Sequence, residues 1–376
     1  MAGPGLPGTV ARARYTLDSG RVDSAHAPWA PLIDDIIRQR YPDPGDPAAH
    51  ALRLAWTRSL AASTYRTYAA KFRKFLHFCA TRGLVPVPAA PTTLELFVGH
   101  LIAEGKVGAA SFPQYISAIR AVHRDLLLPY PDRPVLTLLL RGAQRLQRAS
   151  ALREESWPLP ASAALSALTL ATTSPDPGVV RACLAVGLGF ACMMRGSSVQ
   201  GLAADGASPH AATLQVAEVV RKGHTHSDPV ARSLSIDCTR LPTLLLALSR
   251  WQQLQQGLFQ QSTSPPTHLF QLPGEDLSRG DHFAAWFALC TSSVALVAPA
   301  GRRLHPHCTR RGAASAAHAL GVSMASICHL GGWAMGSQAV WRYIDPLLQA
   351  SPAGFQFFGH LLPPHVHHLW AAAGAP

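Results

Sequence analysis

Tyrosine is missing from more than half of this chain. Six of the seven tyrosines lie between residues 15 and 130, none occurs in residues 131–342, and the seventh is Tyr343. It stands next to Ile344 in a segment that reads LGGWAMGSQAVWRYIDP. The second half of the chain therefore offers a single phenol.

Lysine, paired cysteines and long apolar runs are scarce as well. The chain has 29 arginines but four lysines, and Lys222 is the only lysine after Lys106. Seven cysteines without a CxxC pair favour reduced thiols inside a cell over a disulfide framework. The longest uncharged apolar run, residues 182–194, is too short to span a bilayer. The N-terminal residues lack the apolar core of a targeting peptide, so we expect a soluble, intracellular protein without a membrane partner.

Positive charge is what the chain has in excess. The net charge is +12, and residues 51–150 hold fourteen basic and four acidic side chains, a local balance of +10. A concentrated positive field indicates a polyanionic partner, and nucleic acid is favoured over a membrane surface. The excess of arginine over lysine also fits a compositional bias of the genome.

Periodicity and composition predict a mainly α protein with a small antiparallel β-sheet. Residues rich in proline and glycine begin the chain, with one short helix around Leu32–Arg40, and two prolines interrupt the pattern again after Ser150. The predicted segments are a poorly ordered arm (1–45), a helical domain (46–150), a linker (151–160), a mixed α+β domain (161–360) and a tail (361–376).

The helical domain carries the candidate DNA contacts. Tyr65, Tyr68, Phe72, Phe75 and Cys79 recur at steps of three and four, which places them on one face of a helix. Basic side chains lie off this apolar stripe, where they can meet phosphates, although a bundle with a solvated charged face would look the same. The candidates are Arg66, Arg73, Lys74, Arg120, Arg141 and Arg145.

The mixed domain is predicted to hold a hairpin among helices. Two β-like runs, 213–221 and 230–236, flank a polar turn that contains Lys222. The predicted helices are 161–173, 177–194, 241–256, 281–293, 309–319, 323–330 and 337–343.

A histidine and an arginine share one helical face in the segment HPHCTRRGAASAAHALGVS. His307 and Arg310 are three residues apart, whereas Arg311 points about 100° away. With this many histidines and arginines, one such pair is expected by chance, and another occurs at His50 and Arg53. The pair alone therefore decides nothing.

The motifs around this pair are more specific. HCTRRG, then GVSMASICHLGGW, then WRYIDP resembles the C-terminal signature of the tyrosine recombinase (phage integrase) family, a family also found in mobile elements. GFACMMRGSSVQGL and RKGHTHSDPVARSLSI resemble that family's first-arginine and hairpin-lysine segments. STYRTYAAKFRKFLHFC and ASFPQYISAIRAVHRDLLLPYPDRP resemble its core-binding domain, so the resemblance covers roughly residues 50–350. The residues at the family's catalytic positions are Arg195, Lys222, His307, Arg310, Trp333 and Tyr343.

The resemblance implies a two-domain DNA clamp, with a core-binding and a catalytic domain, that cuts and rejoins DNA through a 3′-phosphotyrosyl intermediate. Fixed guanidinium groups would offset the charge of the phosphodiester, Lys222 would protonate the departing 5′ oxygen, and Tyr343 would be the nucleophile. Neither metal nor ATP is implied, because the intermediate keeps the bond energy. The implied partners are double-stranded DNA and three further copies of the chain, as a homotetramer on two duplexes.

Three departures from the family pattern stand out. Ser198 occupies a position, three after the first arginine, where an acidic residue is frequent. Trp333 fills a place that is histidine in many members, and it lies ten residues before Tyr343, a slightly longer spacing than usual.

Two other functions stay open at this point. A descendant of the family that binds DNA without cutting it would keep the fold and the basic surface, and Ser198 mildly favours it. A metal hydrolase could use His305, His307 and His329, but no Asp or Glu lies between Asp281 and Asp345 to complete such a site.

Overall fold

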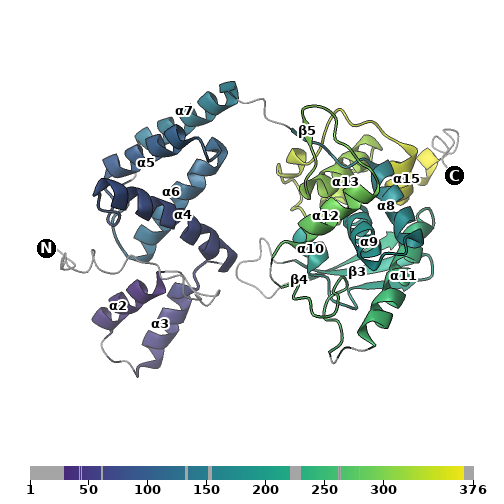
Figure 1. The fold of residues 1–376 in the computed structure, drawn as a ribbon, viewed down its shortest axis with the longest axis horizontal. Helices are drawn as coiled ribbons and strands as arrows, with labels where there is room; N and C mark the ends of the chain where they lie inside the picture. The colour runs from purple at the N-terminus through teal and green to yellow at the C-terminus, as the bar shows by residue number, and fades with distance from the viewer. Residues whose placement is uncertain are drawn as a thin grey trace. The chain divides into compact units, whose positions relative to one another are not determined.

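The computed structural model describes residues 29–41, 43, 45–60, 62–131, 134–150, 155–220, 230–260, 262, 264–278 and 280–367. The chain divides into two compact units, Met1–Arg153 and Glu154–Pro376 (Figure 1). The first unit is helical, and the second combines helices with a small antiparallel sheet, so the predicted fold class is confirmed. No helix in the described part of the chain is long and apolar enough to cross a membrane.

The first unit encloses an aromatic core. Phe75 meets Phe97 edge to face, with ring centroids 5.1 Å apart, and Tyr65 and Cys79 are buried beside them, as predicted for one face of a helix. The helices of this unit are α2 (Ala30–Arg40), α3 (Pro47–Thr57), α4 (Ala62–Arg82), α5 (Pro91–Glu104), α6 (Phe112–Asp125) and α7 (Pro134–Ser150).

The short helix predicted inside the N-terminal arm, residues 1–45, is present as α2 and belongs to this core. Trp29 and Ile33 are buried, and the indole N–H of Trp29 donates to the carboxylate of Asp125 over 3.0 Å. These residues are therefore an ordered part of the first unit, which corrects the prediction for this stretch. Residues 1–28 lie outside the described part of the chain.

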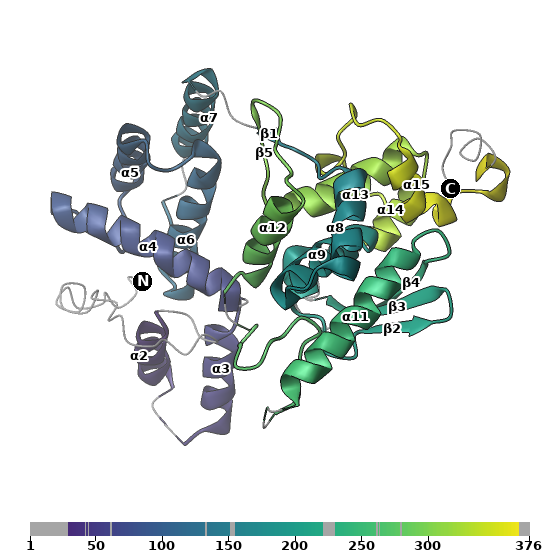
Figure 2. The ribbon, with the colours of Figure 1, turned by 45° about the vertical axis from the view of Figure 1, so that its right-hand side comes forward.

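The second unit is organised around one buried helix. Helix α9 is apolar and buried on all sides from Ala182 to Ala191, and it packs against α8, α11, α12 and α13 (Figure 2). The helices of this unit are α8 (Ala161–Thr173), α9 (Pro177–Ala191), α10 (Gly196–Gln200), α11 (Pro242–Phe259), α12 (His282–Ser293), α13 (His307–Ala319), α14 (Met324–Gly331) and α15 (Pro352–Phe358).

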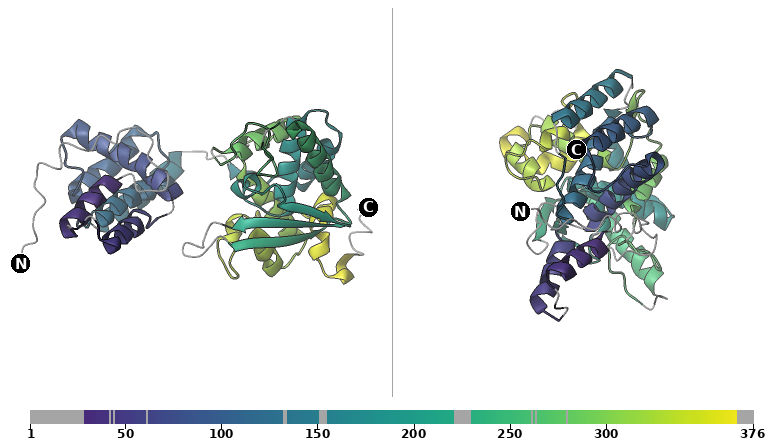
Figure 3. Two further views of the ribbon diagram at one scale, coloured as in Figure 1. Left: turned by 90° about the horizontal axis from the view of Figure 1, so that it is seen from below. Right: turned by 90° about the vertical axis from the view of Figure 1, so that its left-hand side faces the viewer.

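The predicted hairpin is part of a three-stranded antiparallel sheet. The strand order is β2 (Ala207–His210), β3 (Thr213–Val220), β4 (Val230–Asp237), and the strands lie side by side in the left view of Figure 3. Alternate residues such as Val216 and Leu234 are buried, which fixes the register. The tip of the hairpin, residues 221–229, lies outside the described residues.

Two sequence expectations change near the candidate site. The helix predicted over 337–343 is only a 3-10 turn, Val340–Arg342: the Ser337 hydroxyl accepts the N–H of Ala339 in a local turn, and the N–H of Tyr343 donates to the carbonyl three residues back, that of Val340. Within the predicted linker, Glu155–Ser156 forms β1, which pairs in parallel with β5, Arg302–Arg303. This part of the linker thus belongs to the second unit.

Candidate active site

Arg310 is a charged side chain at the centre of the second unit. It lies in the first turns of α13 and is 1 % exposed. Its Nη1 donates to the carbonyl of Met193 and its Nη2 to the carbonyl of Gly331, each over 2.6 Å. These bonds offset part of the cost of removing a cation from water. Its Nε is buried and has no hydrogen-bond partner among the described residues.

Two aromatic rings cover the guanidinium. The guanidinium carbon of Arg310 is 3.9 Å from the centroid of the Trp333 ring and 5.3 Å from that of Tyr343. The two rings also touch, with centroids 5.1 Å apart and planes inclined by 58°. Cations are attracted to such ring faces. Three of the predicted catalytic residues, from three separate segments of the sequence, are thus brought into direct contact.

The glycine pair of LGGW makes this contact possible. Gly332 ends α14 with φ +64°, a left-handed turn that favours glycine. A Cβ at Gly331 would lie 1.9 Å from the Trp333 ring, so a side chain there is incompatible with the observed position of the indole. The two glycines therefore return the chain so that Trp333 lies over Arg310.

Arg195 adds a second positive charge nearby. It is half-buried at the N-terminal cap of α10. The pKa of Arg310 falls to about 9, mainly because the side chain is buried and also because the charge of Arg195 lies close. The two predicted arginines are therefore electrostatic neighbours.

Of the other two predicted catalytic residues, the structure describes only His307. His307 is exposed at the start of α13, with its ring 5.9 Å from that of His305 and its backbone N–H donating to Nδ1 of His305 over 3.3 Å. His305 in turn lies 2.7 Å from the hydroxyl of Ser156, and burial lowers its pKa. Lys222 falls in the hairpin tip, outside the described residues.

The sequence interpretation missed a largely buried ion pair between the two hairpin strands, near their tip ends. Glu218 on β3 is directly opposite Arg232 on β4 and forms a hydrogen-bonded ion pair with it. Arg232 also donates from Nη1 to the carbonyls of His329 and Leu330, over 2.7 and 3.1 Å. The next carbonyl, that of Gly331, accepts a hydrogen bond from Arg310. A glutamate in the otherwise apolar run VAEVV was the available signal.

Glu218 is also the acidic residue whose charge reaches Arg310. Its negative charge counts among the effects that raise the pKa of Arg310, against burial and Arg195. Ser198, at the position where an acidic residue was expected, is half-buried in α10. Glu218 therefore acts on Arg310 from the sheet, whereas Ser198 brings no negative charge to the turn that follows Arg195.

The predicted DNA contacts of the first unit divide into two groups. Five of the six arginine and lysine candidates are exposed, and Arg120 lies 4.8 Å from the centroid of the Tyr130 ring. Lys74 is half-buried and lies 2.5 Å from the carboxylate of Glu104, so its charge is partly neutralised. The exposed candidates are Arg66, Arg73, Arg120, Arg141 and Arg145.

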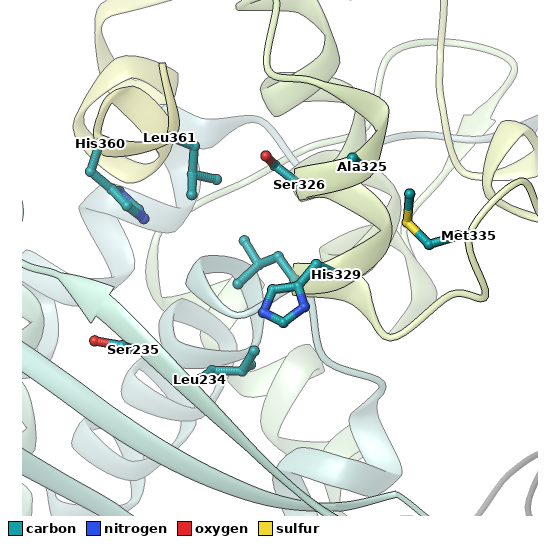
Figure 4. A pocket seen from close by; sticks show the side chains of 9 residues that line it. Leu234, Ser235, Ala325, Ser326, His329, Met335, His360 and Leu361 are labelled. Carbon is teal, nitrogen blue, oxygen red and sulfur yellow. The ribbon is translucent and has the colours of Figure 1, made fainter. Parts of the chain in front are cut away.

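A pocket lies beside α14, the helix that leads to Trp333. It has a volume of about 400 Å³ and lies between β4 and α14, where His329 and His360 point inward beside apolar side chains such as Met335 (Figure 4). Neither ring nitrogen of His360 has a hydrogen-bond partner among the described residues, and burial lowers its pKa. The described residues contain no group of three or more His, Cys, Asp or Glu side chains that could hold a metal ion.

Comparison with known proteins gives a match in structure only. No protein-family model matches the chain, and no curated protein matches its sequence. The fold resembles XerH site-specific recombinase bound to palindromic difH substrate in a post-cleavage complex, with a TM-score of 0.53 and 10 % identity over 92 % of this chain and 89 % of that one. A pre-cleavage complex of XerH with difH gives 0.53 and 11 % identity over 84 % and 81 %. The fold expected from the tyrosine recombinase resemblance is confirmed.

Proposed function

We propose that this chain is a tyrosine recombinase that cleaves and rejoins DNA through a covalent bond to Tyr343. The observation that carries the proposal is the cluster of Arg310, Trp333 and Tyr343. These residues come from HCTRRG, LGGW and WRYIDP, and the fold brings their side chains into contact. A cation beside the only phenol of this unit suits a reaction in which a phenol attacks a phosphodiester.

Each side chain has a task that its chemistry supports. Arg310 and Arg195 bind the non-bridging oxygens and stabilise the charge that develops on them, since guanidinium stays protonated and donates two parallel hydrogen bonds. Trp333 donates its indole N–H to the same phosphate. The phenol of Tyr343 must lose its proton as it attacks. His307, exposed one turn before Arg310 on α13, takes part in that proton transfer.

The bond changes balance without an energy source. The Tyr343 oxygen forms a bond to phosphorus, the bond to the 5′ oxygen breaks, and that oxygen receives a proton. Lys222 is the proposed donor of this proton. A 5′ hydroxyl from another strand then attacks the phosphotyrosine and releases Tyr343. One phosphodiester is exchanged for another, so the reaction requires neither ATP nor a metal.

The burial of Arg310 adds a step to this scheme. At 1 % exposure the guanidinium is closed to a phosphate, and the Trp333 and Tyr343 rings form part of its cover. DNA must therefore displace at least one of these rings before Arg310 can bind a phosphate. The unpartnered Nε and the N–H groups not used by Met193 and Gly331 are then available to the phosphate.

Double-stranded DNA is the proposed partner. The basic residues of the first unit would hold the duplex backbone, and the second unit would supply the cutting site, as two halves of a clamp. XerH is seen on its difH substrate, and by analogy this chain is proposed to act on a specific DNA site as a homotetramer on two duplexes. Its place of action is wherever that DNA is kept, in the nucleus or the bacterial nucleoid.

A descendant that binds DNA without cutting it is the second candidate. Ser198 in place of an acidic residue is the observation that favours it. Against it stand the retained Tyr343 and the charge of Glu218, which acts on Arg310 from the sheet. The two candidates differ in one outcome, the covalent adduct.

The test uses duplexes with a randomised central segment, because the target site is unknown. The protein is incubated with the library and denatured, and the DNA that stays attached is recovered and sequenced. We expect a defined set of sequences from the wild type and none from Tyr343→Phe. Tyr41→Phe, which removes an exposed phenol in the first unit, is the matched control and should behave as wild type. DNA binding without an adduct would favour the second candidate.

A further inference from the structure

We infer that Ser315 is a positioning residue that holds the backbone of Tyr343 in place for attack, an inference that rests on the proposed function. Ser315 lies in α13, five residues after Arg310, and its side chain is fully buried. The family resemblance gave it no role.

The Ser315 hydroxyl bonds the backbone on both sides of Ile344, the residue that follows Tyr343. The Ser315 hydroxyl donates to the carbonyl of Tyr343 over 3.0 Å and accepts from the backbone N–H of Asp345 over 2.8 Å. Ile344, between them, is buried in the core. A buried hydroxyl that both donates and accepts has its hydrogen-bonding groups satisfied by this one segment.

The composition of α13 explains why such a short side chain can reach. Gly312, Ala313, Ala314, Ala316 and Ala317 surround Ser315 in the sequence, and all are buried. With no bulky side chain on this part of the helix, the Tyr343 segment approaches closely enough for a one-carbon side chain to bond its backbone. The alanine-rich run of α13 thus allows the close approach of the Tyr343 segment, next to the turn of the same helix that carries Arg310.

The carboxylate of Asp345 fixes the segment at a further point. Its Oδ1 accepts the N–H of Leu347 over 3.1 Å. Its Oδ2 lies 3.4 Å from Nη1 of Arg302 and 3.7 Å from Nη2 of Arg311. Asp345 is buried, so these two arginines compensate a charge that would otherwise be costly. They connect the Tyr343 segment to β5 and to α13.

The consequence concerns the accuracy of attack. Helix α13 carries Arg310, which the proposal assigns to the phosphate, and also Ser315, which holds the nucleophile. The distance between nucleophile and phosphate site is therefore set within one rigid helix. Reacting atoms need to approach within about 3–3.5 Å, and an error of about 1 Å can reduce the rate about 100-fold.

The test compares two buried hydroxyls of the same helix. Ser315→Ala removes both hydrogen bonds to the Tyr343 segment. Thr309→Val is the matched control, because the Thr309 hydroxyl is buried without a hydrogen-bond partner among the described residues. At saturating DNA, we expect Ser315→Ala to form the covalent adduct about 10- to 100-fold more slowly, with a DNA dissociation constant within about twofold of wild type. Thr309→Val should match wild type in both.

A second measurement needs no DNA. The amide of Asp345 in the free wild-type protein should exchange its hydrogen slowly, and it should exchange quickly in Ser315→Ala. Fast exchange in the wild type would overturn the inference, as would an unchanged adduct rate in Ser315→Ala or an equal loss in Thr309→Val. A wild type that forms no adduct on any DNA would refute the proposed function, while slow exchange at Asp345 would still show that Ser315 holds this segment.

Discussion

Arg310 and Trp333 are stacked, with the guanidinium carbon of Arg310 3.9 Å from the centroid of the indole ring. The same guanidinium donates to the carbonyl of Gly331, two residues before that indole. Arg310 thus holds the end of α14 from which Trp333 emerges, and Arg232 holds the two preceding carbonyls. Two arginines from different elements fix this helix end, so changes there should alter the site without removing any reacting group.

Gly331→Ala is the smallest such change. The added methyl would lie 1.9 Å from the Trp333 ring, so the indole must move away from Arg310. We expect a loss of about 1–3 kcal/mol in unfolding free energy and strongly reduced adduct formation. Urea unfolding measures the first effect, and the rate of covalent adduct formation measures the second. Gly257→Ala in α11 is the control: its methyl would meet nothing within 4 Å, and we expect a gain of roughly 0.5–1 kcal/mol. A normal adduct rate in Gly331→Ala would contradict the role of the Trp333 position.

Glu218→Gln tests the buried ion pair. Glu218 is 3 % exposed, and the substitution leaves the half-buried Arg232 without its counter-charge. Breaking such a pair costs about 3–5 kcal/mol, and the loss of a negative charge near Arg310 should further lower the pKa of that arginine. Glu155→Gln is the control, since Glu155 is an exposed partner of Arg302 and such pairs contribute at most about 1 kcal/mol. Equal effects of the two substitutions on thermal unfolding would contradict this account.

Much of the site could be predicted from residues close in sequence, and little of it from residues far apart. Local sequence patterns predicted the hairpin and a helix over 309–319, because these depend on neighbouring residues; in the structure that helix begins two residues earlier, at His307. The helix expected over 337–343 is only a 3-10 turn, and the carbonyl of Tyr343 is bonded by the hydroxyl of Ser315, 28 residues earlier in the sequence.

The neutralisation of Lys74 could not be seen either, because Glu104 lies thirty residues further along the chain. The ion pair of Glu218 with Arg232 depends on the register between β3 and β4. The sequence indicated this register only through the alternation of apolar and polar residues along the two strands. The roles of Ser315 and Asp345 depend on tertiary contacts that no spacing rule describes.

The neutralisation of Lys74 gives a prediction for DNA binding. Arg66 and Arg73 are exposed on α4, whereas Lys74 on the same helix is half-buried against Glu104. Each lost phosphate contact should reduce the slope of log affinity against log salt by about 0.9. We expect Arg66→Ala and Arg73→Ala each to show this change and Lys74→Ala to show less. Equal changes in all three, measured by fluorescence anisotropy on one duplex, would mean that Glu104 releases Lys74 when DNA binds.

His123 makes the stability of the first unit depend on pH. Its Nδ1–H donates to the carbonyl of Ile119 over 2.8 Å, which leaves Nε2 to accept the N–H of Ala89 over 2.9 Å. Burial lowers the pKa of His123 below 6.5. The contribution of neutral His123 is therefore complete above about pH 6.5 and is lost as the pH falls through the folded-state pKa.

Urea unfolding at about pH 7.5 and about pH 5 measures this dependence. The first unit should lose stability between the two, and His123→Gln should reduce the difference. His77→Gln, at an exposed histidine of α4, should leave the difference as it is in the wild type. A stability of the first unit that does not change with pH in this range would contradict the buried neutral imidazole.

The covalent adduct remains the most direct test of the central claim. A nicked duplex that carries a sequence recovered from the randomised library should trap the intermediate, because the short fragment with the 5′ hydroxyl diffuses away. After denaturation and digestion, mass spectrometry of the protein–DNA adduct should locate the nucleotide on the peptide that contains Tyr343, and chelator should not change the yield. Folded protein that forms no adduct on any DNA, or an adduct that persists in Tyr343→Phe, would contradict the claim that this tyrosine cleaves DNA.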